Sequence, residues 1–400
     1  MEKATELKVL FWPGWWYPSR LNPMSGIFIQ RHAQAVSSLC DVAVLYIVPD
    51  PGLARKQVME TTSENGLRIT RIFFRPGTRV PGLAKLADLV RYYRLSRLGL
   101  KAVREDFGIP DILHVQVNPP LGQIAYILAH AGRTPCIFSE HWSGYFPESG
   151  DYKGLFRKWF TRRLVRKAKA VTVVSLAAQN AMQRHGLENE YHVIANVVDP
   201  VLFTPKREKS REGKKNILHV SGFNLCKNLP GMLRAVKKLA EKRDDFQLHM
   251  VGDGAGRGEL EELAARLGIK DRVVRFHGRK NDAEVAGFMR RADLFLMFSD
   301  YENSPCVIAE AFASGLPVIA TRTGGIPEHV HDDNGILVAP GDEEGLARAI
   351  AFMLDHPGNY DAAKIREYAL RNFSPDVIGR RFHGLYRRVA AAAAEGRHAK

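Results

Sequence analysis

Short apolar runs alternate with longer amphipathic stretches along the whole chain. An apolar run bounded by turn residues predicts a buried strand, and apolar residues at helical spacing predict a helix that packs on a sheet. Regular alternation of the two is typical of parallel β/α units. The pattern therefore predicts an α/β protein in which each half of the chain forms a doubly wound parallel sheet with helices on both faces.

The strands that this pattern predicts are spread evenly over the two halves. Those of the first half are Leu7–Phe11, Val42–Val48, Leu67–Phe74, Ile112–Val117, Cys136–Phe138 and Val171–Val174. Those of the second half are Asn216–Ser221, Phe246–Val251, Val273–His277, Leu294–Phe298, Pro317–Ala320 and Gly335–Val338.

A break separates the halves. The segment Asn196–Pro205 contains two prolines, and the polar stretch Lys206–Lys215 follows it, which indicates a linker. Two domains also suit the 400 residues of the chain, because single hydrophobic cores stop growing near about 250–300 residues. The last predicted helix, about Val377–Ala394, carries Phe382, Leu385, Tyr386 and Val389 at helical spacing.

The most informative stretch of the chain surrounds two glutamates. The apolar run Ala292–Phe298 predicts a buried strand, and Asn303, Ser304 and Pro305 predict a helix start. In that start, a capping side chain is followed by Pro at the first helical position. Glu302 then lies in a strand-to-helix loop, which is where open α/β sheets bind ligands.

Glu310 lies within the predicted helix. It follows Pro305 by five residues, which is about 7.5 Å along a helix axis. The free amides at the helix start are suited to an anion such as a diphosphate. At its depth, Glu310 is placed to accept hydrogen bonds from two ribose hydroxyls, while Glu302 lies nearer the sugar. This arrangement predicts a nucleotide-sugar site.

The run from Glu302 to Glu328 resembles the core signature of the retaining group 1 glycosyltransferases, which have the two-domain GT-B fold and an E-x7-E motif. The resemblance implies two Rossmann-like domains that face a cleft, with a C-terminal helix that crosses back to the first domain. We therefore expect an N-terminal acceptor-binding domain over residues 1–197, a nucleotide-sugar-binding domain over residues 198–376, and the returning helix over residues 377–400.

The segment Val220–Asn228 resembles the family's G-R-L-x-x-x-K-N loop, in which Arg and Lys bind the donor diphosphate. Lys227 stands at the Lys position, whereas Gly222 replaces the Arg and Ser221 replaces the preceding Gly. One cation is therefore missing, and the Ser221 hydroxyl or loop amides are the expected substitutes. The alternative for Lys227 is a solvated surface lysine.

Further donor contacts are expected at other strand ends of the second domain. Gly252 and Gly254 do not complete a dinucleotide fingerprint, because Arg257 stands where a third Gly is needed. We expect a tight turn that lines the nucleotide pocket instead. Arg279 follows the next strand, where the family meets the nucleobase. The remaining expected donor contacts are Asn303, Ser304 and Pro305.

In the first domain, Gly14 lies in a long loop that, in the family, closes over donor and acceptor. Gly14 allows close approach of the backbone to a phosphate or sugar, whereas Trp15 and Trp16 either stack on a sugar or anchor the loop. His141 resembles the family's cleft histidine, which orients a hydroxyl near the donor sugar; the alternative is a structural histidine. Asn118 ends another strand and is expected to contact the acceptor.

The resemblance also implies a mechanism in which anomeric configuration is retained. Lys227 and the helix amides would stabilise charge on the leaving diphosphate, Glu310 would hold the ribose, and Glu302 would orient the sugar. Glu302, His141 and Lys227 are accordingly the expected catalytic residues. In the family a phosphate oxygen is thought to take the acceptor's proton. Neither a side-chain base nor a D-x-D metal motif is then needed, and we expect no metal and no cofactor.

Composition sets the expected surroundings. An apolar content of 45% with 25% charged residues is ordinary for a soluble globular protein. The four cysteines are widely spaced, so neither a zinc site nor a disulfide framework is predicted. The N-terminus lacks the apolar region of a signal peptide, and no apolar run approaches the roughly 18 residues of a membrane span. A cytoplasmic protein is expected.

The net charge of +15 lies mainly in the first half, where residues 1–197 hold 26 Lys and Arg against 15 Asp and Glu. Such a field favours lipid head groups, phosphorylated substrates or nucleic acid. The predicted helices Leu83–Arg104 and Lys153–Ala170 interleave basic residues with an apolar stripe. Either helix fits a membrane-surface element or a domain helix with a charged outer face. Because both fall in the expected acceptor domain, we expect a protein that is peripheral on the inner face of the cell membrane.

The sequence thus favours a retaining glycosyltransferase that uses a UDP- or GDP-linked sugar. Its acceptor is a glycan, a glycolipid or a small molecule, and cell-surface polysaccharide or glycolipid assembly is the expected setting. A transferase for a small soluble acceptor is one alternative, and a nucleotide-sugar epimerase or a phosphorylase on the same architecture is another. A non-catalytic basic module that binds membrane or nucleic acid leaves the E-x7-E run without a role, and we expect no nucleic acid partner.

Overall fold

The computed structural model describes residues 7–14, 16–77, 84–116, 124–125, 127–128, 134–205 and 213–398, without the side chains of residues 84–86 and 396–398. The described residues form two compact units. The first unit takes in those of 1–174, 178–196 and 375–400, and the second takes in those of 175–177 and 197–374. Within this described part of the chain, every helix is too short or too polar to cross a membrane.

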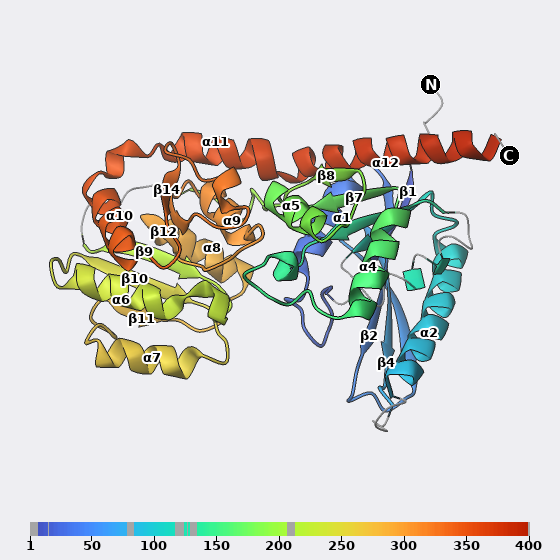
Figure 1. The fold of residues 1–400 in the computed structure, drawn as a ribbon, viewed down its shortest axis with the longest axis horizontal. Coiled ribbons are helices and arrows are strands. Elements are labelled where there is room, and N and C mark those ends of the chain that lie inside the picture. Colours follow the sequence, from blue (N-terminus) through green and yellow to red (C-terminus); the bar gives the residue numbers. More distant parts are fainter. Residues whose placement is uncertain are drawn as a thin grey trace. The chain divides into compact units, whose positions relative to one another are not determined.

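The first unit is built on one eight-stranded sheet (Figure 1). Its strands are β1 (Lys8–Pro13), β2 (Asp41–Pro49), β3 (Gln57–Glu64), β4 (Leu67–Phe74), β5 (Ile112–Gln116), β6 (Cys136–Glu140), β7 (Ala170–Val173) and β8 (Tyr191–Val193). They lie in the order β3-β4-β2-β1-β5-β6-β7-β8. The helices that go with them are α1 (Ile27–Ser37), α2 (Ala84–Asp106), η1 (Ser143–Tyr145), α4 (Leu155–Lys167), α5 (Leu176–Arg184) and α12 (Pro375–His398).

One edge of this sheet corrects the all-parallel sheet predicted for the first half. β3 pairs with β4 in antiparallel fashion, while the other neighbouring strands of the unit are parallel. Asn65 and Gly66 join the two strands with φ values of 51° and 79°. Positive φ at both central residues is the type I′ hairpin geometry that Asn-Gly favours. β3 was missed because its sequence has no apolar run and its side chains are largely exposed.

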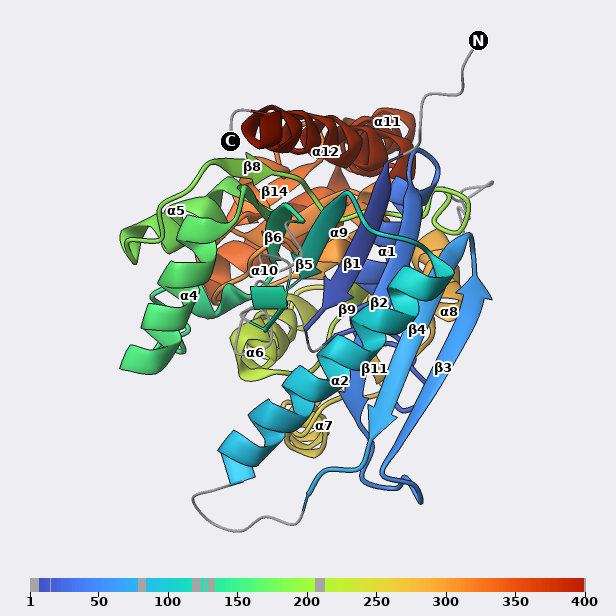
Figure 2. The ribbon, with the colours of Figure 1, turned by 90° about the vertical axis from the view of Figure 1, so that its right-hand side faces the viewer.

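Two helices cover the sheet of the first unit in different ways. α2 packs across β2 and β4 (Figure 2). α12 packs on α1, and its Phe382 and Tyr386 are fully buried, as their helical spacing predicts. A Cβ atom on Gly379 would overlap the backbone of Ala35, so this close packing of α12 on α1 needs glycine.

The second unit contains a six-stranded sheet in which all neighbouring strands are parallel. Its strands are β9 (Lys215–Val220), β10 (Phe246–Val251), β11 (Val274–Phe276), β12 (Leu294–Met297), β13 (Val318–Thr321) and β14 (Gly335–Val338). Its helices are η2 (Leu225–Lys227), α6 (Leu229–Ala240), α7 (Arg257–Arg266), α8 (Asp282–Arg291), α9 (Cys306–Ala313), η3 (Ile326–Glu328), α10 (Glu343–Asp355), η4 (Pro357–Asn359) and α11 (Ala362–Phe373).

The strand order β11-β10-β9-β12-β13-β14 reverses direction between β9 and β12. Such a reversal is a topological switch point, and open α/β sheets bind ligands in the crevice beyond the strand ends at that place. The side chains of β12 are at most 1% exposed, so packing on both faces fixes the strand that leads into this crevice. The predicted α/β fold with two Rossmann-like units and a returning C-terminal helix is confirmed, apart from the antiparallel edge.

Candidate active site

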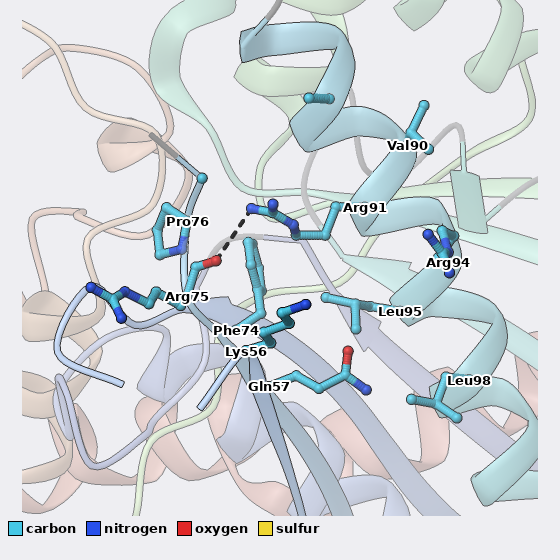
Figure 3. A pocket seen from close by; sticks show the side chains of 12 residues that line it. Lys56, Gln57, Phe74, Arg75, Pro76, Val90, Arg91, Arg94, Leu95 and Leu98 are labelled. Carbon is cyan, nitrogen blue, oxygen red and sulfur yellow. Dashed lines mark hydrogen bonds between the residues drawn. The ribbon is translucent and has the colours of Figure 1, made fainter. Parts of the chain in front are cut away.

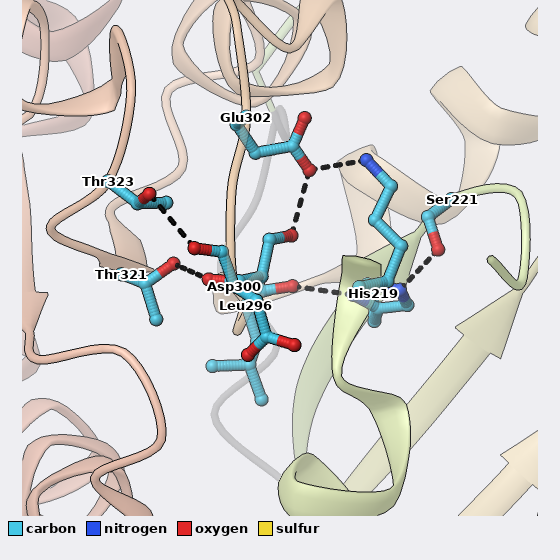
Figure 4. A network of polar contacts seen from close by, with 9 residues as sticks. His219, Ser221, Leu296, Asp300, Glu302, Thr321 and Thr323 are labelled. Atoms are coloured by element: carbon cyan, nitrogen blue, oxygen red, sulfur yellow. Dashed lines mark hydrogen bonds and ion pairs between the residues drawn. The ribbon is translucent and has the colours of Figure 1, made fainter. Parts of the chain in front are cut away.

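Lys227 and Glu302 meet at the switch point of the second unit. Figure 4 shows Glu302 in its network of polar contacts. Lys227 follows β9, Glu302 follows β12, and these two strands are hydrogen-bonded neighbours. Nζ of Lys227 donates to Oε1 of Glu302, and the two side chains are only 15% and 10% exposed. The structure therefore brings together two residues that are 75 positions apart in the sequence.

Ser299 gives Glu302 a second partner. Its hydroxyl donates to the same Oε1 atom of Glu302 at 2.8 Å. A nearby cation and hydrogen-bond donors stabilise a buried carboxylate, and Lys227 and Ser299 provide both. Oε2 of Glu302 accepts neither of these two bonds, so it is the oxygen suited to a ligand hydroxyl.

Three loops that hold Glu302 are tied together by further hydrogen bonds. The Thr321 hydroxyl donates to the carbonyl oxygen of Ser299 at 2.6 Å, and that of Thr323 donates to the carbonyl of Asp300 at 3.0 Å. Nδ2 of Asn228 donates to Oδ1 of Asp300 at 3.0 Å. Sequence reasoning missed these residues, because single Ser, Thr and Asn side chains in loops have no periodic signal.

Gly324 and Gly325 hold the Glu302 loop from the side of β13. Gly324 has a φ of 52°, and a Cβ atom there would overlap the carbonyl oxygen of Glu302. A Cβ atom on Gly325 would overlap the carbonyl of Asn303, to which the Gly325 amide donates at 2.9 Å. The Gly-rich turn seen in the sequence therefore serves close backbone contact with the Glu302 loop.

Helix α9 starts later than predicted. Its N-cap is Pro305 and its first residue is Cys306, without a side-chain cap, so the prediction of a capping side chain followed by Pro305 at the first helical position is wrong. Pro305 has an extended ψ of 117°, and Oδ1 of Asn303 accepts a hydrogen bond from Ser175 at 2.7 Å. In the first turn of α9, the amide of Ile308 donates to the carbonyl oxygen of Pro305 at 3.1 Å.

Glu310 lies on α9 and is 6% exposed. It follows Cys306 by four residues, which is about 6 Å along the helix axis. Pro305 and Ser304 are half-buried at the start of the same helix. The helix therefore offers an anion its positive end, with a carboxylate one turn deeper.

The hydroxyl of Ser221 is occupied by His219. Nδ1 of His219 lies 2.9 Å from the carbonyl oxygen of Leu296, which can only accept, so Nδ1 carries the proton. Nε2 then accepts the Ser221 hydroxyl at 2.7 Å. Burial lowers the pKa of His219 to about 4, so the ring stays neutral near pH 7. The expected use of the Ser221 hydroxyl as a diphosphate donor is incompatible with this bond.

Gly252 and Gly254 pack the loop after β10 against the loop after β9. Gly252 has a φ of 145°, and its Cβ atom would overlap the carbonyl of Ser221. A Cβ atom on Gly254 would lie 2.7 Å from the carbonyl oxygen of Phe223. Gly222 and Arg279 are exposed.

Gly14 and His141 belong to the first unit. The Gly14 amide donates to the carbonyl of Gln116 at 2.9 Å, and Nε2 of His141 lies 2.8 Å from Oε1 of Gln116. Burial holds the pKa of His141 well below its usual value, with His32 and His114 adding to the effect. Neutral His141 therefore donates its Nε2 proton to Gln116. Trp15 and Asn118, the other first-domain predictions, lie outside the described residues.

Glu140 precedes His141 and is a buried carboxyl that the sequence reasoning did not single out. It accepts hydrogen bonds from the amides of His141 and Trp142 at 2.9 and 3.0 Å, and from the Tyr145 hydroxyl at 2.9 Å. Burial raises its pKa to about 7. These bonds fix the loop after β6, so Glu140 positions the backbone of His141.

Comparison with protein families matches each half of the chain to a separate model. Residues 202–371 match the family model described as "Glycosyl transferases group 1". Residues 25–197 match the model described as "Glycosyl transferase 4-like domain". The two matches nearly adjoin at the predicted linker.

The chain is similar to curated proteins with different names. N-acetyl-alpha-D-glucosaminyl L-malate synthase of Bacillus anthracis is 33% identical over 178 residues, 44% of this chain and 46% of that protein. The chain thus spans about half the length of this relative. The putative teichuronic acid biosynthesis glycosyltransferase TuaC of Bacillus subtilis is 25% identical over 84% of this chain and 86% of that protein.

Among solved structures, HepE of Anabaena in complex with UDP aligns with a TM-score of 0.69 and 20% identity, over 95% of this chain and 99% of that chain. At this identity the likeness shows the fold, which is GT-B.

Proposed function

We propose that this chain, which combines a glycosyltransferase 4-like domain with a group 1 glycosyltransferase domain, transfers a hexose or related sugar from a nucleoside-diphosphate sugar to an acceptor hydroxyl with retention of anomeric configuration. The observation that carries the proposal is the Lys227–Glu302 ion pair at the switch point of the second unit. A cation for phosphate and a carboxylate for sugar stand there beside the start of α9.

In the proposed reaction, the bond between the anomeric carbon and the diphosphate oxygen breaks, and a bond from the acceptor oxygen forms on the same face. The electron pair of the broken bond stays on the diphosphate, and the acceptor's proton passes to a phosphate oxygen. Lys227 and the first amides of α9 stabilise the negative charge that develops. A phosphate oxygen serves as the base, so the chemistry proceeds without a metal-bound group.

Glu302 and Glu310 hold the two ends of the donor in this proposal. Oε1 of Glu302 is held by Lys227 and Ser299, which leaves Oε2 to orient a sugar hydroxyl and to support positive charge at the anomeric carbon. Glu310, one turn into α9, accepts hydrogen bonds from the ribose hydroxyls. Gly222 is exposed and has no side chain at the position where the family has its Arg. Loop amides take the place of the Ser221 hydroxyl in binding the diphosphate.

The acceptor is assigned to the first unit, with Trp15, Asn118 and His141 on the acceptor side and Gly14 among the donor-binding residues. Because the match to the teichuronic acid enzyme covers most of both chains, we assign the protein to cell-surface polysaccharide or glycolipid assembly, as a peripheral protein of the cytoplasmic membrane face. The half-length match to the malate enzyme keeps a small soluble acceptor as the second candidate.

Donor binding and stereochemistry test the proposal. A thermal-shift screen of UDP-, GDP- and ADP-sugars is expected to show stabilisation by one nucleotide class, and NMR of the product from an α-linked donor is expected to show an α-glycoside. An inverted product would refute retention. Salt-dependent RNA binding without affinity for any nucleoside diphosphate would instead favour a non-catalytic basic module.

Replacing Glu310 by alanine is expected to weaken donor binding about 10-fold or more, because two charge-assisted hydrogen bonds to ribose are lost. Turnover at saturating donor is expected to change much less. Isothermal titration with the preferred nucleotide, combined with steady-state kinetics, measures both quantities. Glu344→Ala is the matched control, since Glu344 is exposed and pairs with Lys238 on α6. Unchanged donor affinity in a folded Glu310→Ala protein would contradict the ribose assignment.

A further inference from the structure

A basic pocket of about 1000 Å³ lies beside α2 in the first unit (Figure 3). Four cations line it: Lys56 and Arg75 next to β3 and β4, and Arg91 and Arg94 from α2. Its described lining includes no acidic side chain. Nη1 of Arg91 donates to the carbonyl of Arg75 at 3.2 Å, which fixes that guanidinium at the pocket wall. Converging positive charge of this kind favours an anionic ligand.

The floor of this basic pocket is apolar. Phe74, Leu95 and Leu98 line it together with the four cations. Asp88 forms an ion pair with Arg91 at 3.7 Å, and the two side chains are 56% and 37% exposed. Such an exposed pair contributes little and is easily screened. The pocket therefore suits a phosphate whose attached chain continues onto apolar surface.

An apolar cavity of about 980 Å³ adjoins the basic pocket, and Phe74 and Pro76 line both. Its α2 residues, Asp88, Leu89 and Tyr92, lie on the neighbouring face of the helix. Most of its other walls are apolar. They include Leu21, Ile47, Val48, Phe156 and Phe160. The cavity also reaches Gly14, in the loop that the proposed function places beside the acceptor.

Helix α4 leaves three large apolar side chains in solvent next to this cavity. Leu155 is 86% exposed, Phe156 82% and Trp159 57%. Six basic residues and no acidic residue share the helix with them: Arg157, Lys158, Arg162, Arg163, Arg166 and Lys167. Exposed aromatic residues among cations are typical of a helix that lies in the head-group region of an anionic bilayer.

We infer that the basic pocket and the apolar cavity together bind a lipid-borne phosphate, and that this lipid carries the acceptor. The inference rests on the proposed function and names its substrate class. The cations of the basic pocket take the phosphate, the apolar cavity takes the first part of the hydrocarbon chain, and α4 lies in the anionic membrane from which the lipid comes. The chain path follows from Phe74 and Pro76, which border both spaces.

Binding to anionic lipid vesicles tests this inference. Wild-type protein is expected to co-sediment with vesicles of phosphatidylglycerol mixed with phosphatidylcholine, more weakly at high salt, and not with pure phosphatidylcholine. Substituting Lys56, Arg91 and Arg94 by glutamine is expected to weaken binding about 100-fold, since each cation near an anionic surface contributes roughly 1 kcal/mol. Substituting Phe156 and Trp159 by serine is expected to weaken it at least about 10-fold.

Two controls separate the possible outcomes. Substituting Lys242, Arg266 and Arg348 by glutamine removes the same charge from exposed positions of the second unit and is expected to leave vesicle binding unchanged. A short-chain phosphatidic acid below its micelle concentration is expected to protect the first unit against thermal unfolding, whereas inorganic phosphate at the same concentration is not. Equal protection by both would show a free-phosphate site and overturn the lipid assignment.

Donor hydrolysis without acceptor does not require the lipid, so it keeps this inference separate from the proposed function. The variant at Lys56, Arg91 and Arg94 and the variant at Phe156 and Trp159 are both expected to retain donor hydrolysis. Loss of vesicle binding in the Lys242, Arg266 and Arg348 variant would show that binding depends only on the net charge of the protein. That result would overturn the inference. RNA binding would also overturn the inference if the Lys56, Arg91 and Arg94 substitutions weakened it and the Phe156 and Trp159 substitutions left it unchanged. Absence of donor hydrolysis in the wild type would refute the proposed function instead.

Discussion

Replacing Lys227 by methionine is expected to lower kcat about 100- to 1,000-fold, the loss typical when one group that stabilises developing charge is removed. Lys227 is the cation that the structure places at the switch point, and Gly222 stands at the position of the second cation that the family carries. The methionine is close in length to the lysine stem, so the change removes the charge with little change in packing. Single-turnover kinetics at saturating donor measures the effect.

The same variant has a structural consequence that must be separated from catalysis. Removing Lys227 leaves Glu302 buried without its cation, and breaking a buried pair from one side costs about 3–5 kcal/mol. The double variant Lys227→Met, Glu302→Gln removes both charges and is expected to regain much of the lost thermal stability without regaining turnover. If activity returned together with stability, Lys227 would be a structural residue and the assigned role would be wrong.

Replacing Glu302 by glutamine alone is expected to lower kcat about 100-fold, the scale of loss when one group that stabilises developing charge is removed. The amide keeps the shape of the side chain and can still accept from Ser299, but it cannot support positive charge at the anomeric carbon. Donor affinity is expected to change less than turnover. Steady-state kinetics and titration of the donor measure the two effects.

Ser299→Ala is the companion variant for Glu302. It removes one of the two hydrogen bonds to Oε1 of Glu302 that the structure describes and keeps the charge, so a smaller loss, of about 10-fold or less, is expected. A Ser299→Ala variant as inactive as Glu302→Gln would show that orientation alone, and not the charge of Glu302, supports turnover.

The second unit was the more predictable half of the fold. Its strands are continuous apolar runs because both faces of a parallel sheet are buried, and β14 has the bounds that its sequence predicts. The edge strand β3 lacks such a run and was missed, although Asn65-Gly66 is a strong hairpin signal. The Asn-Gly pair is recognised from turn residues, whereas the strands were predicted from apolar runs.

The sequence predicted the charged residues of the candidate site, but it did not predict the hydrogen bonds that support them. Glu302, Glu310 and Lys227 have the spacing of a recognised motif, whereas Ser299, Thr321 and Thr323 act through hydrogen bonds to backbone or carboxylate that only the folded loops create. The capping side chain expected before Pro305 is another example, because α9 has Pro305 as its N-cap without a side-chain hydrogen bond, while Oδ1 of Asn303 accepts from Ser175. Tertiary partners of loop residues leave no pattern in a single sequence.

A crystal structure of the protein with its preferred nucleoside-diphosphate sugar tests the central claim most directly. We expect a diphosphate oxygen within about 3.2 Å of Nζ of Lys227, with Glu302 and Glu310 at hydrogen-bond distance from the sugar and the ribose. A donor bound elsewhere, or a Glu310 carboxylate turned away from the ribose, would contradict it.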